Sequence, residues 1–262
     1  MQPLRFATAG SVDDGKSTLI GRLLYDARAL QEDQLAAVER ASLRRGAGEL
    51  DLSLVTDGLE AEREQGITID VAYRYFATPV RKFIIADSPG HEQYTRNMAT
   101  GASNADALVL LLDVTRPLLP QSRRHLVIAR LLGIRHAIVF VNKLDLADYA
   151  RAAYDRVRSG LEAFAAPLRF DSLVCIPGSA LRGDMVVERG ERLDWYGGPT
   201  LLERLESVPA STDRAAAGPL RFPVQLVSPP RAGHPRAYMG RIESGHVLAG
   251  APVAALPGGR TT

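Results

Sequence analysis

A glycine-rich run near the N-terminus constrains the fold of this chain more than any other feature. The pattern G-x-x-x-x-G-K-[ST] is matched by Gly10-Ser11-Val12-Asp13-Asp14-Gly15-Lys16-Ser17, between the apolar run Leu4–Ala9 and a stretch of helical period. Glycines let successive N–H groups point at one phosphate, and the helix N-terminus adds a partial positive charge. We therefore predict a phosphate-binding loop rather than an ordinary glycine turn.

Each residue type in this loop suits a particular part of a nucleoside triphosphate. Lys16 is expected to reach the β- and γ-phosphates, and the Ser17 hydroxyl to ligate Mg²⁺. Thr18, in the first helical turn, completes the expected phosphate contacts. Of the 32 basic residues only Lys16, Lys82 and Lys143 are lysine. A compact ammonium in a chain that otherwise uses arginine suggests a site that a guanidinium would not fit.

Short apolar runs alternate with segments of helical period, which predicts a mostly parallel, six-stranded sheet covered on both faces. The expected strands are Leu4–Ala9, Phe83–Ala86, Ala107–Leu112, Ala137–Val141 and Leu173–Pro177, with Val71–Phe76 as an antiparallel edge strand. The expected helices are Lys16–Ala29, Gln31–Arg45, Gln93–Ser103, Gln121–Leu132 and Asp148–Phe164. The α/β class follows from this alternation.

A change of composition suggests a second domain after residue 208. We predict a nucleotide-binding domain over 1–208, a small-residue linker over 209–218, and the start of an all-β barrel over 219–262. The strand-like runs Phe222–Val227 and Ala237–Ile242 support the all-β assignment. About forty-five residues are few for such a domain, so we expect a truncated barrel.

Charge, cysteine content and hydropathy exclude several classes of function. The formal net charge of +2 gives no reason to expect nucleic acid binding. Cys175 is the only cysteine, so no disulfide framework exists within the chain, as is typical of a reducing cytoplasm. No long apolar stretch indicates a membrane span or a signal peptide.

A second motif indicates which base the nucleotide carries. The strand Ala137–Val141 runs into Asn142-Lys143-Leu144-Asp145, an N-K-x-D pattern. The Asp145 carboxylate can accept hydrogen bonds from the N1–H and exocyclic amine of guanine, a donor pair that adenine lacks. Lys143 is expected along the base plane. The run Ser179-Ala180-Leu181, at the next strand end, would offer a backbone N–H to guanine O6. We therefore predict GTP and GDP as ligands.

Two further segments match the switches that respond to a γ-phosphate. Asp87, at the end of a strand, is expected to hold Mg²⁺ through water, and the Gly90 N–H to meet a γ-phosphate oxygen. Thr68 offers a second hydroxyl ligand for Mg²⁺ between the other motifs. His91 follows Gly90, where a neutral imidazole would orient the attacking water. The other four histidines are expected to be surface or packed residues.

These motifs together resemble the translation-factor class of GTPases. Within that class, the chain is similar to the GTPase subunit of bacterial sulfate adenylyltransferase over Phe6–Leu24, His91–Ser103 and Leu132–His136. Elongation factors carry histidine at the position of Asp14 and threonine at that of Ser17. The chain departs from the subfamily pattern at Ser88, over Asp113–Pro117 and at Arg182.

The resemblance implies a P-loop NTPase G domain and a definite role. It implies GTP hydrolysis that drives formation of adenosine 5′-phosphosulfate and pyrophosphate from ATP and sulfate, with a small catalytic subunit as partner. It also implies that Val12 and Ile67 flank His91 as a hydrophobic gate, and that Asp13 helps to hold a monovalent cation. Some relatives continue into an adenylylsulfate kinase domain. Two alternatives stay open: a translation-type factor that delivers charged tRNA, and a regulatory switch with negligible turnover.

Overall fold

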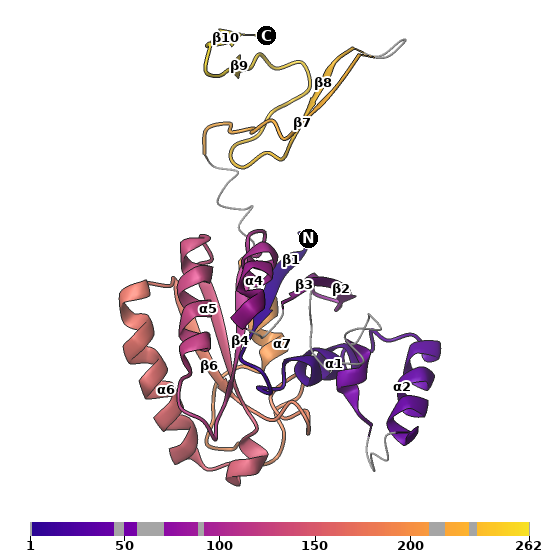
Figure 1. Ribbon diagram of the computed structural model, residues 1–262, viewed down its shortest axis with the longest axis vertical. Helices are drawn as coiled ribbons and strands as arrows, with labels where there is room; N and C mark the ends of the chain where they lie inside the picture. Colours follow the sequence, from indigo (N-terminus) through magenta and orange to yellow (C-terminus); the bar gives the residue numbers. More distant parts are fainter. Residues whose placement is uncertain are drawn as a thin grey trace. The chain divides into compact units, whose positions relative to one another are not determined.

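The computed structural model of the chain describes residues 2–44, 50–56, 71–88, 92–209, 218–230 and 235–261. The chain divides into two compact units, Met1–Val208 and Pro209–Thr262. The first unit contains the sheet, the helices and all the sequence motifs described above, and Figure 1 shows its arrangement.

A six-stranded sheet with the order β2-β3-β1-β4-β5-β6 forms the centre of the first unit. Its strands are β1 (Leu4–Ala9), β2 (Ala72–Ala77), β3 (Lys82–Asp87), β4 (Ala107–Asp113), β5 (His136–Asn142) and β6 (Ser172–Pro177). All neighbours pair in parallel except β2, which is antiparallel to β3 at the edge, as predicted. Every residue of β4 is buried, because a central parallel strand is covered on both faces.

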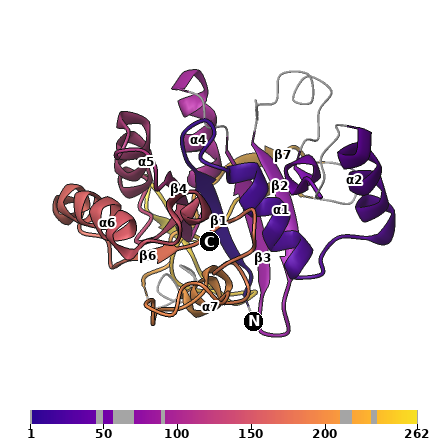
Figure 2. The ribbon, with the colours of Figure 1, turned by 90° about the horizontal axis from the view of Figure 1, so that it is seen from below.

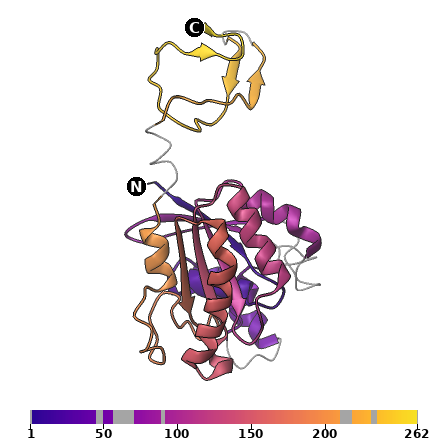
Figure 3. The same cartoon turned by 90° about the vertical axis from the view of Figure 1, so that its left-hand side faces the viewer.

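Helices lie on both sides of this sheet. They are α1 (Lys16–Asp26), α2 (Glu32–Arg44), α4 (Thr95–Ala102), α5 (Pro120–Leu131), α6 (Arg151–Ala165) and α7 (Leu201–Ser207). Helices α4, α5 and α6 stand together along one side (Figure 2), and α7 lies on the side opposite α5 and α6 (Figure 3). Short 3₁₀ turns occupy Leu52–Val55 (η1), Glu92–Tyr94 (η2), Leu144–Ala147 (η3) and Ala166–Leu168 (η4).

Three helices differ clearly from the sequence-based expectation. Helix α1 ends at Asp26 rather than Ala29, and Arg28 beyond it has a left-handed φ of 54°. Helix α6 begins at Arg151 rather than Asp148, because Asp148 and Tyr149 have left-handed φ angles of 47° and 55° that no α-helix tolerates. Helix α7 was not predicted. It begins with a capping box, in which Thr200 and Glu203 exchange side-chain and backbone hydrogen bonds. Its seven residues are too few to show a periodic pattern.

Helix α1 packs unusually closely against the segment that follows α2. A Cβ atom at Gly21 would lie 1.9 Å from the Leu52 carbonyl oxygen, so only glycine fits there. This contact allows η1 to pack directly against α1. The main core lies between the sheet and its helices, with Phe6, Phe83 and Phe140 among its largest fully buried side chains.

The second unit holds two short antiparallel pairs. Strands β7 (Leu226–Ser228) and β8 (Ala237–Met239) form one, and β9 (Ala254–Ala255) and β10 (Arg260–Thr261) form the other. The expected strand over Phe222–Val227 is therefore shorter and begins later than its apolar pattern suggested. Within the described part of the chain, no helix is long and apolar enough to cross a bilayer.

Candidate guanine nucleotide site

The predicted phosphate loop connects β1 to α1 and curls through two left-handed residues. Asp13 has a φ of 65° and Gly15 a φ of 88°. A Cβ atom at Gly15 would lie 2.4 Å from the Asn142 side-chain nitrogen, so glycine is required here for both conformation and space. The curl places the loop residues 10–15 at the carboxyl edge of the sheet, directly before the first turn of α1. This is the geometry expected of a phosphate site.

Lys16 lies buried behind the loop and pairs with the predicted magnesium-binding aspartate. Its Nζ atom lies 3.2 Å from Asp87 Oδ1, and both side chains are less than one-tenth exposed. The same carboxylate oxygen accepts a hydrogen bond of 2.9 Å from Thr8 Oγ1, because Thr8 and Asp87 are partners in the β1–β3 register. Ser17, half-buried, follows in the first turn of α1. The structure thus brings the phosphate lysine, the hydroxyl and the carboxylate to one edge.

The polar side chains at this edge suit a magnesium ion that is bound partly by the protein and partly by a nucleotide. Among the described residues, no three His, Cys, Asp or Glu side chains are grouped closely enough to hold a metal by themselves. The expected ligands Ser17 and Asp87 supply one hydroxyl and one carboxylate, and Mg²⁺ commonly completes its shell with water and phosphate oxygens. Thr68, the expected second hydroxyl, lies outside the described residues.

Asn142 connects the phosphate loop to both segments predicted to read the base. Its Nδ2 donates to the Asp14 carbonyl oxygen at 2.8 Å, and its Oδ1 accepts the Ala180 N–H at 2.8 Å. The Leu144 N–H donates in addition to the Gly178 carbonyl at 3.2 Å. Asn142 therefore acts as a brace between three loops, a role that the N-K-x-D pattern alone does not indicate.

Lys143 is held by an aspartate that sequence reasoning did not include in the site. The Lys143 Nζ atom lies 2.9 Å from Asp113 Oδ2, and Thr115 donates its N–H and its hydroxyl to Asp113 Oδ1. Burial acts to raise the Asp113 pKa, but the bonds from Lys143 and Thr115 outweigh it and lower the pKa below its usual value. Only its place at the end of a strand could have indicated this role from the sequence. Asp113 ends β4, and it lies beside Asn142, which ends the neighbouring strand β5.

Asp145 carries an oxygen that no group in the described protein satisfies. Its Oδ1 atom is buried and has no hydrogen-bond partner. A buried carboxylate oxygen without a donor is unfavourable, so the site is incomplete without a ligand that donates to it. Of the nearby Ser179-Ala180-Leu181 run, the Ala180 N–H is already donated to Asn142, whereas the Leu181 N–H has no acceptor among the described residues. The Asp145 Oδ1 acceptor and the Leu181 N–H donor therefore remain available. They match the N1–H or amine donors and the O6 acceptor of guanine.

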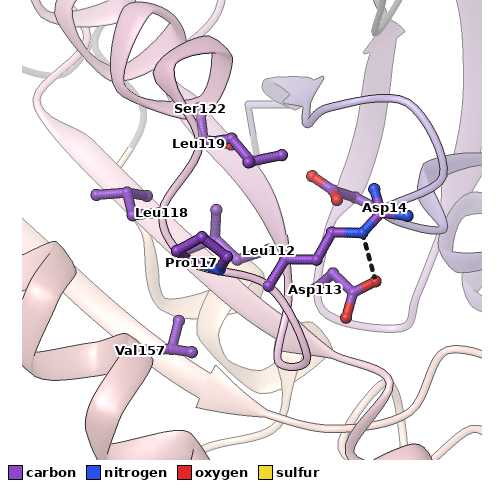
Figure 4. Close-up of a pocket in the computed structure, with 9 residues that line it drawn as sticks. Asp14, Leu112, Asp113, Pro117, Leu118, Leu119, Ser122 and Val157 are labelled. Carbon is purple, nitrogen blue, oxygen red and sulfur yellow. Dashed lines mark ion pairs between the residues drawn. The ribbon is translucent and has the colours of Figure 1, made fainter.

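Asp14 is the most unusual group of the phosphate loop. It is 2% exposed, its Oδ2 accepts the Ser11 N–H at 2.7 Å, and its Oδ1 has no partner among the described residues. Burial raises the pKa of Asp14 to about 7, although the Ser11 hydrogen bond and the charges of Arg116 and Lys143 act to lower it. Figure 4 shows Asp14 beside Asp113 and Ser122 in the small pocket that they line.

Arg116 ties this pocket to the outer part of the phosphate loop. Its Nη1 donates to the Val12 carbonyl oxygen at 3.4 Å, and its Nε lies 3.7 Å from Asp113 Oδ2, the ion pair drawn as a dashed line in Figure 4. Arg116 belongs to the segment 113–117 in which the chain departs from the subfamily pattern. Val12 itself is 36% exposed.

We expect Asp14→Asn to stabilise the protein increasingly as pH rises. The folded-state pKa of about 7 lies above the ordinary aspartate pKa of 3.8, so folding becomes less favourable as pH rises between these values. The amide stays neutral and keeps an acceptor for the Ser11 N–H. The gain in unfolding free energy from Asp14→Asn should therefore grow by about 2–3 kcal/mol between pH 5 and pH 8. Urea unfolding of both proteins at the two pH values measures it, and a gain independent of pH would contradict it.

Four predicted site residues lie outside the described part of the chain. They are Gly90, His91, Ile67 and Thr68, the residues assigned to the switches and the catalytic gate. The remaining predicted positions are all brought to the carboxyl edge of the sheet, from the ends of β1, β3, β5 and β6. The site described here is thus the phosphate loop and the base-reading loops.

Comparison with known proteins decides the family. Residues 1–210 match the sequence profile of the family described as "Elongation factor Tu GTP binding domain". This chain belongs to that family. The match covers the first unit, which carries the whole candidate site, and agrees with the sheet order and loop geometry above.

Individual proteins are similar over nearly all of this chain. A "Bifunctional enzyme CysN/CysC" of Mycobacterium tuberculosis (strain H37Rv) is 56% identical over 99% of the chain and 42% of that protein. A "Sulfate adenylyltransferase subunit 1" of Vibrio parahaemolyticus is 55% identical over 99% of the chain and 55% of that protein. The chain thus spans about half the length of these curated relatives.

A solved structure supports the same fold. The crystal structure of a bacterial selenocysteine-specific elongation factor, EF-Sec, has a TM-score of 0.60 and 26% identity, covering 100% of this chain and 38% of that one. The predicted P-loop G domain with a mostly parallel six-stranded sheet is therefore confirmed.

Proposed function

We propose that this chain is the GTP-hydrolysing part of a sulfate adenylyltransferase. In this role GTP hydrolysis drives formation of adenosine 5′-phosphosulfate and pyrophosphate from ATP and sulfate. The observation that carries the proposal is the 55% identity, over 99% of the chain, to a protein named as subunit 1 of that enzyme. The P-loop with Asp14 and Ser17 supports it, because elongation factors carry other residues at these positions.

The described residues suit GTP binding in three ways. The phosphate-loop amides and Lys16 would hold the phosphates, and Asp145 Oδ1 would accept a donor of the guanine. Lys143, fixed by Asp113, would lie along the base. Mg²⁺, when bound through Ser17, Thr68 and Asp87, would supply charge neutralisation between the β- and γ-phosphates. Gly90 would contact the γ-phosphate, and His91, between Val12 and Ile67, would orient the attacking water.

Four finer assignments complete the proposal. The partner is the small subunit that carries the adenylyl-transfer chemistry, and the enzyme works in the cytoplasm. Asp13, an exposed carboxylate in the loop, holds a monovalent cation near the phosphates. Residues 1–208 form the GTP-binding domain, 209–218 are the linker, and 219–262 are the N-terminal part of a β-barrel domain.

The test is steady-state GTP hydrolysis by the full-length protein. Reactions contain the small subunit, ATP and sulfate together, or lack one of the three. We expect strong stimulation only in the complete mixture, with adenosine 5′-phosphosulfate formed in proportion to GTP consumed. Formation of the product is followed by separating the labelled nucleotides.

A parallel reaction with ribosomes tests the second candidate. The structural likeness to a selenocysteine-specific elongation factor favours delivery of charged tRNA as the alternative. Stimulation by ribosomes, with none by the sulfate-activating mixture, would assign the chain to translation. Absence of stimulation in both reactions would indicate a slow regulatory switch.

A further inference from the structure

The chain leaves the N-K-x-D segment in a conformation that non-glycine residues seldom adopt. Asp148 and Tyr149, just after η3, are consecutive left-handed residues. Such a conformation persists only where the surroundings hold it in place. Tyr149 is 8% exposed, its N–H donates to the Leu144 carbonyl at 2.9 Å, and its carbonyl accepts the Trp195 Nε1–H at 3.1 Å. The backbone here is fixed by specific contacts and directs the tyrosine ring inward.

The Tyr149 hydroxyl makes one bond, and it reaches the other base-reading segment. It donates to Asp184 Oδ2 at 2.6 Å, a distance typical of a charge-assisted hydrogen bond. Burial, the bond to Asp184 and the charge of Asp145 raise the Tyr149 pKa well above its usual value. The phenol therefore stays protonated and remains a donor at any physiological pH.

Asp184 fixes the backbone of the loop that carries the Leu181 N–H. Its carbonyl oxygen accepts the Ser179 N–H at 3.3 Å, and the two residues form an isolated antiparallel bridge. A Cβ atom at Gly178 would lie 2.5 Å from the same carbonyl, so the loop has little room to shift against Asp184. Asp184 is therefore one of the groups that fix the position of Ser179-Ala180-Leu181, together with Asn142 and with Arg22, which donates to the Leu181 carbonyl at 2.6 Å.

We infer that Tyr149 is a specificity-determining positioning residue, which holds the Leu181 amide, the expected donor to guanine O6, at a fixed place relative to Asp145. The inference rests on the proposed GTP binding. The two base-reading segments are already joined by the Asn142–Ala180 bond and by the bond from the Leu144 N–H to the Gly178 carbonyl, and the Tyr149–Asp184 bond is a third link, on the far side of Ser179-Ala180-Leu181. Without it the loop keeps its bonds at Gly178, Ala180 and the Leu181 carbonyl but loses the restraint at Asp184, so the Leu181 amide is held less precisely while the Asp145 segment is unchanged.

Two ratios of dissociation constants separate the two contacts to the base. The first is that of 6-thio-GDP to GDP, and the second is that of IDP to GDP. In 6-thio-GDP sulfur, a weaker acceptor, replaces O6, so the preference for GDP over it reports the contact to the amides. IDP lacks the exocyclic amine, so the preference for GDP over IDP reports the Asp145 contact. Both are measured on the full-length protein by displacement of a fluorescent GDP analogue. We expect Tyr149→Phe and Asp184→Ala to lower the first ratio about three- to ten-fold and to leave the second within two-fold.

Matched variants distinguish positioning from general stability. Tyr154 is a buried tyrosine whose hydroxyl donates to the Cys175 carbonyl within β6 at 2.9 Å and makes no hydrogen bond to Asp184, so Tyr154→Phe should keep both ratios. Asp184→Asn keeps an acceptor for the phenol and should also keep them. An unchanged first ratio in either folded Tyr149→Phe or Asp184→Ala would overturn the inference, as would an equal fall in both ratios. A wild-type protein without preference for GDP over ADP would instead refute the proposed function.

Discussion

Asp145→Asn is expected to weaken GDP binding by about 2–4 kcal/mol, the scale of a charged acceptor that loses a pair of hydrogen bonds. The structure gives the reason, because Asp145 Oδ1 is buried and finds no donor within the described protein. An asparagine amide in its place offers one acceptor and one donor. One of the two guanine donors, N1–H or the exocyclic amine, would then face another donor. Isothermal titration of GDP against wild-type and variant protein measures the effect.

The same substitution should create affinity for a different base. Xanthine has a carbonyl oxygen where guanine has the exocyclic amine, and an asparagine amide can donate to it. We therefore expect Asp145→Asn to prefer XDP over GDP, the reverse of the wild-type order. Asp148→Asn is the control, because Asp148 is exposed and its left-handed backbone suits asparagine. Unchanged discrimination in Asp145→Asn would remove this residue from base recognition.

His91→Ala is expected to lower GTP turnover by about 10²–10⁴, the range for loss of a group that orients or deprotonates the attacking water. GTP affinity should stay within a few-fold of wild type, since the phosphate and base contacts are made by other residues. Single-turnover hydrolysis, started from a preformed complex, separates the chemical step from binding. The full-length protein with its partner, ATP and sulfate is the appropriate form.

A histidine outside the site provides the comparison for this experiment. His246 lies in the second unit, in the part of the chain after Val208, and His246→Ala should leave turnover unchanged. Turnover equal to wild type in His91→Ala would exclude this side chain from the hydrolytic step. A parallel loss of affinity would show instead that the substitution disturbs the whole loop.

The sequence predicts those parts of the site that depend on local geometry. The phosphate loop requires glycine at a left-handed position beside a strand end, and that requirement is visible as the pattern from Gly10 to Ser17. The strands could be placed because parallel central strands are continuously apolar, as β4 is. The antiparallel edge strand β2 followed from its short connection to β3.

Contacts between distant segments could not be predicted in the same way. The Lys143–Asp113 pair and the Asn142 brace join residues whose proximity depends on strand register. The start of α6 was misplaced because Asp148 and Tyr149 have ordinary helical propensity, and only tertiary contacts hold them in a left-handed conformation. The elevated pKa of Asp14 depends likewise on burial that the loop pattern does not express.

The order in which the site segments follow one another along the chain has a consequence for the growing polypeptide. Strand β1 is made first and carries the phosphate loop, yet β6, the last strand of the sheet in chain order, supplies the loop that ends near Leu181. A nascent chain released from the ribosome only as far as β5 lacks the Ala180 N–H that engages Asn142 and the Asp184 that engages Tyr149. On the proposed function, selective binding of guanine nucleotide therefore begins late in synthesis. Bound nucleotide would then stabilise the folded domain as a whole.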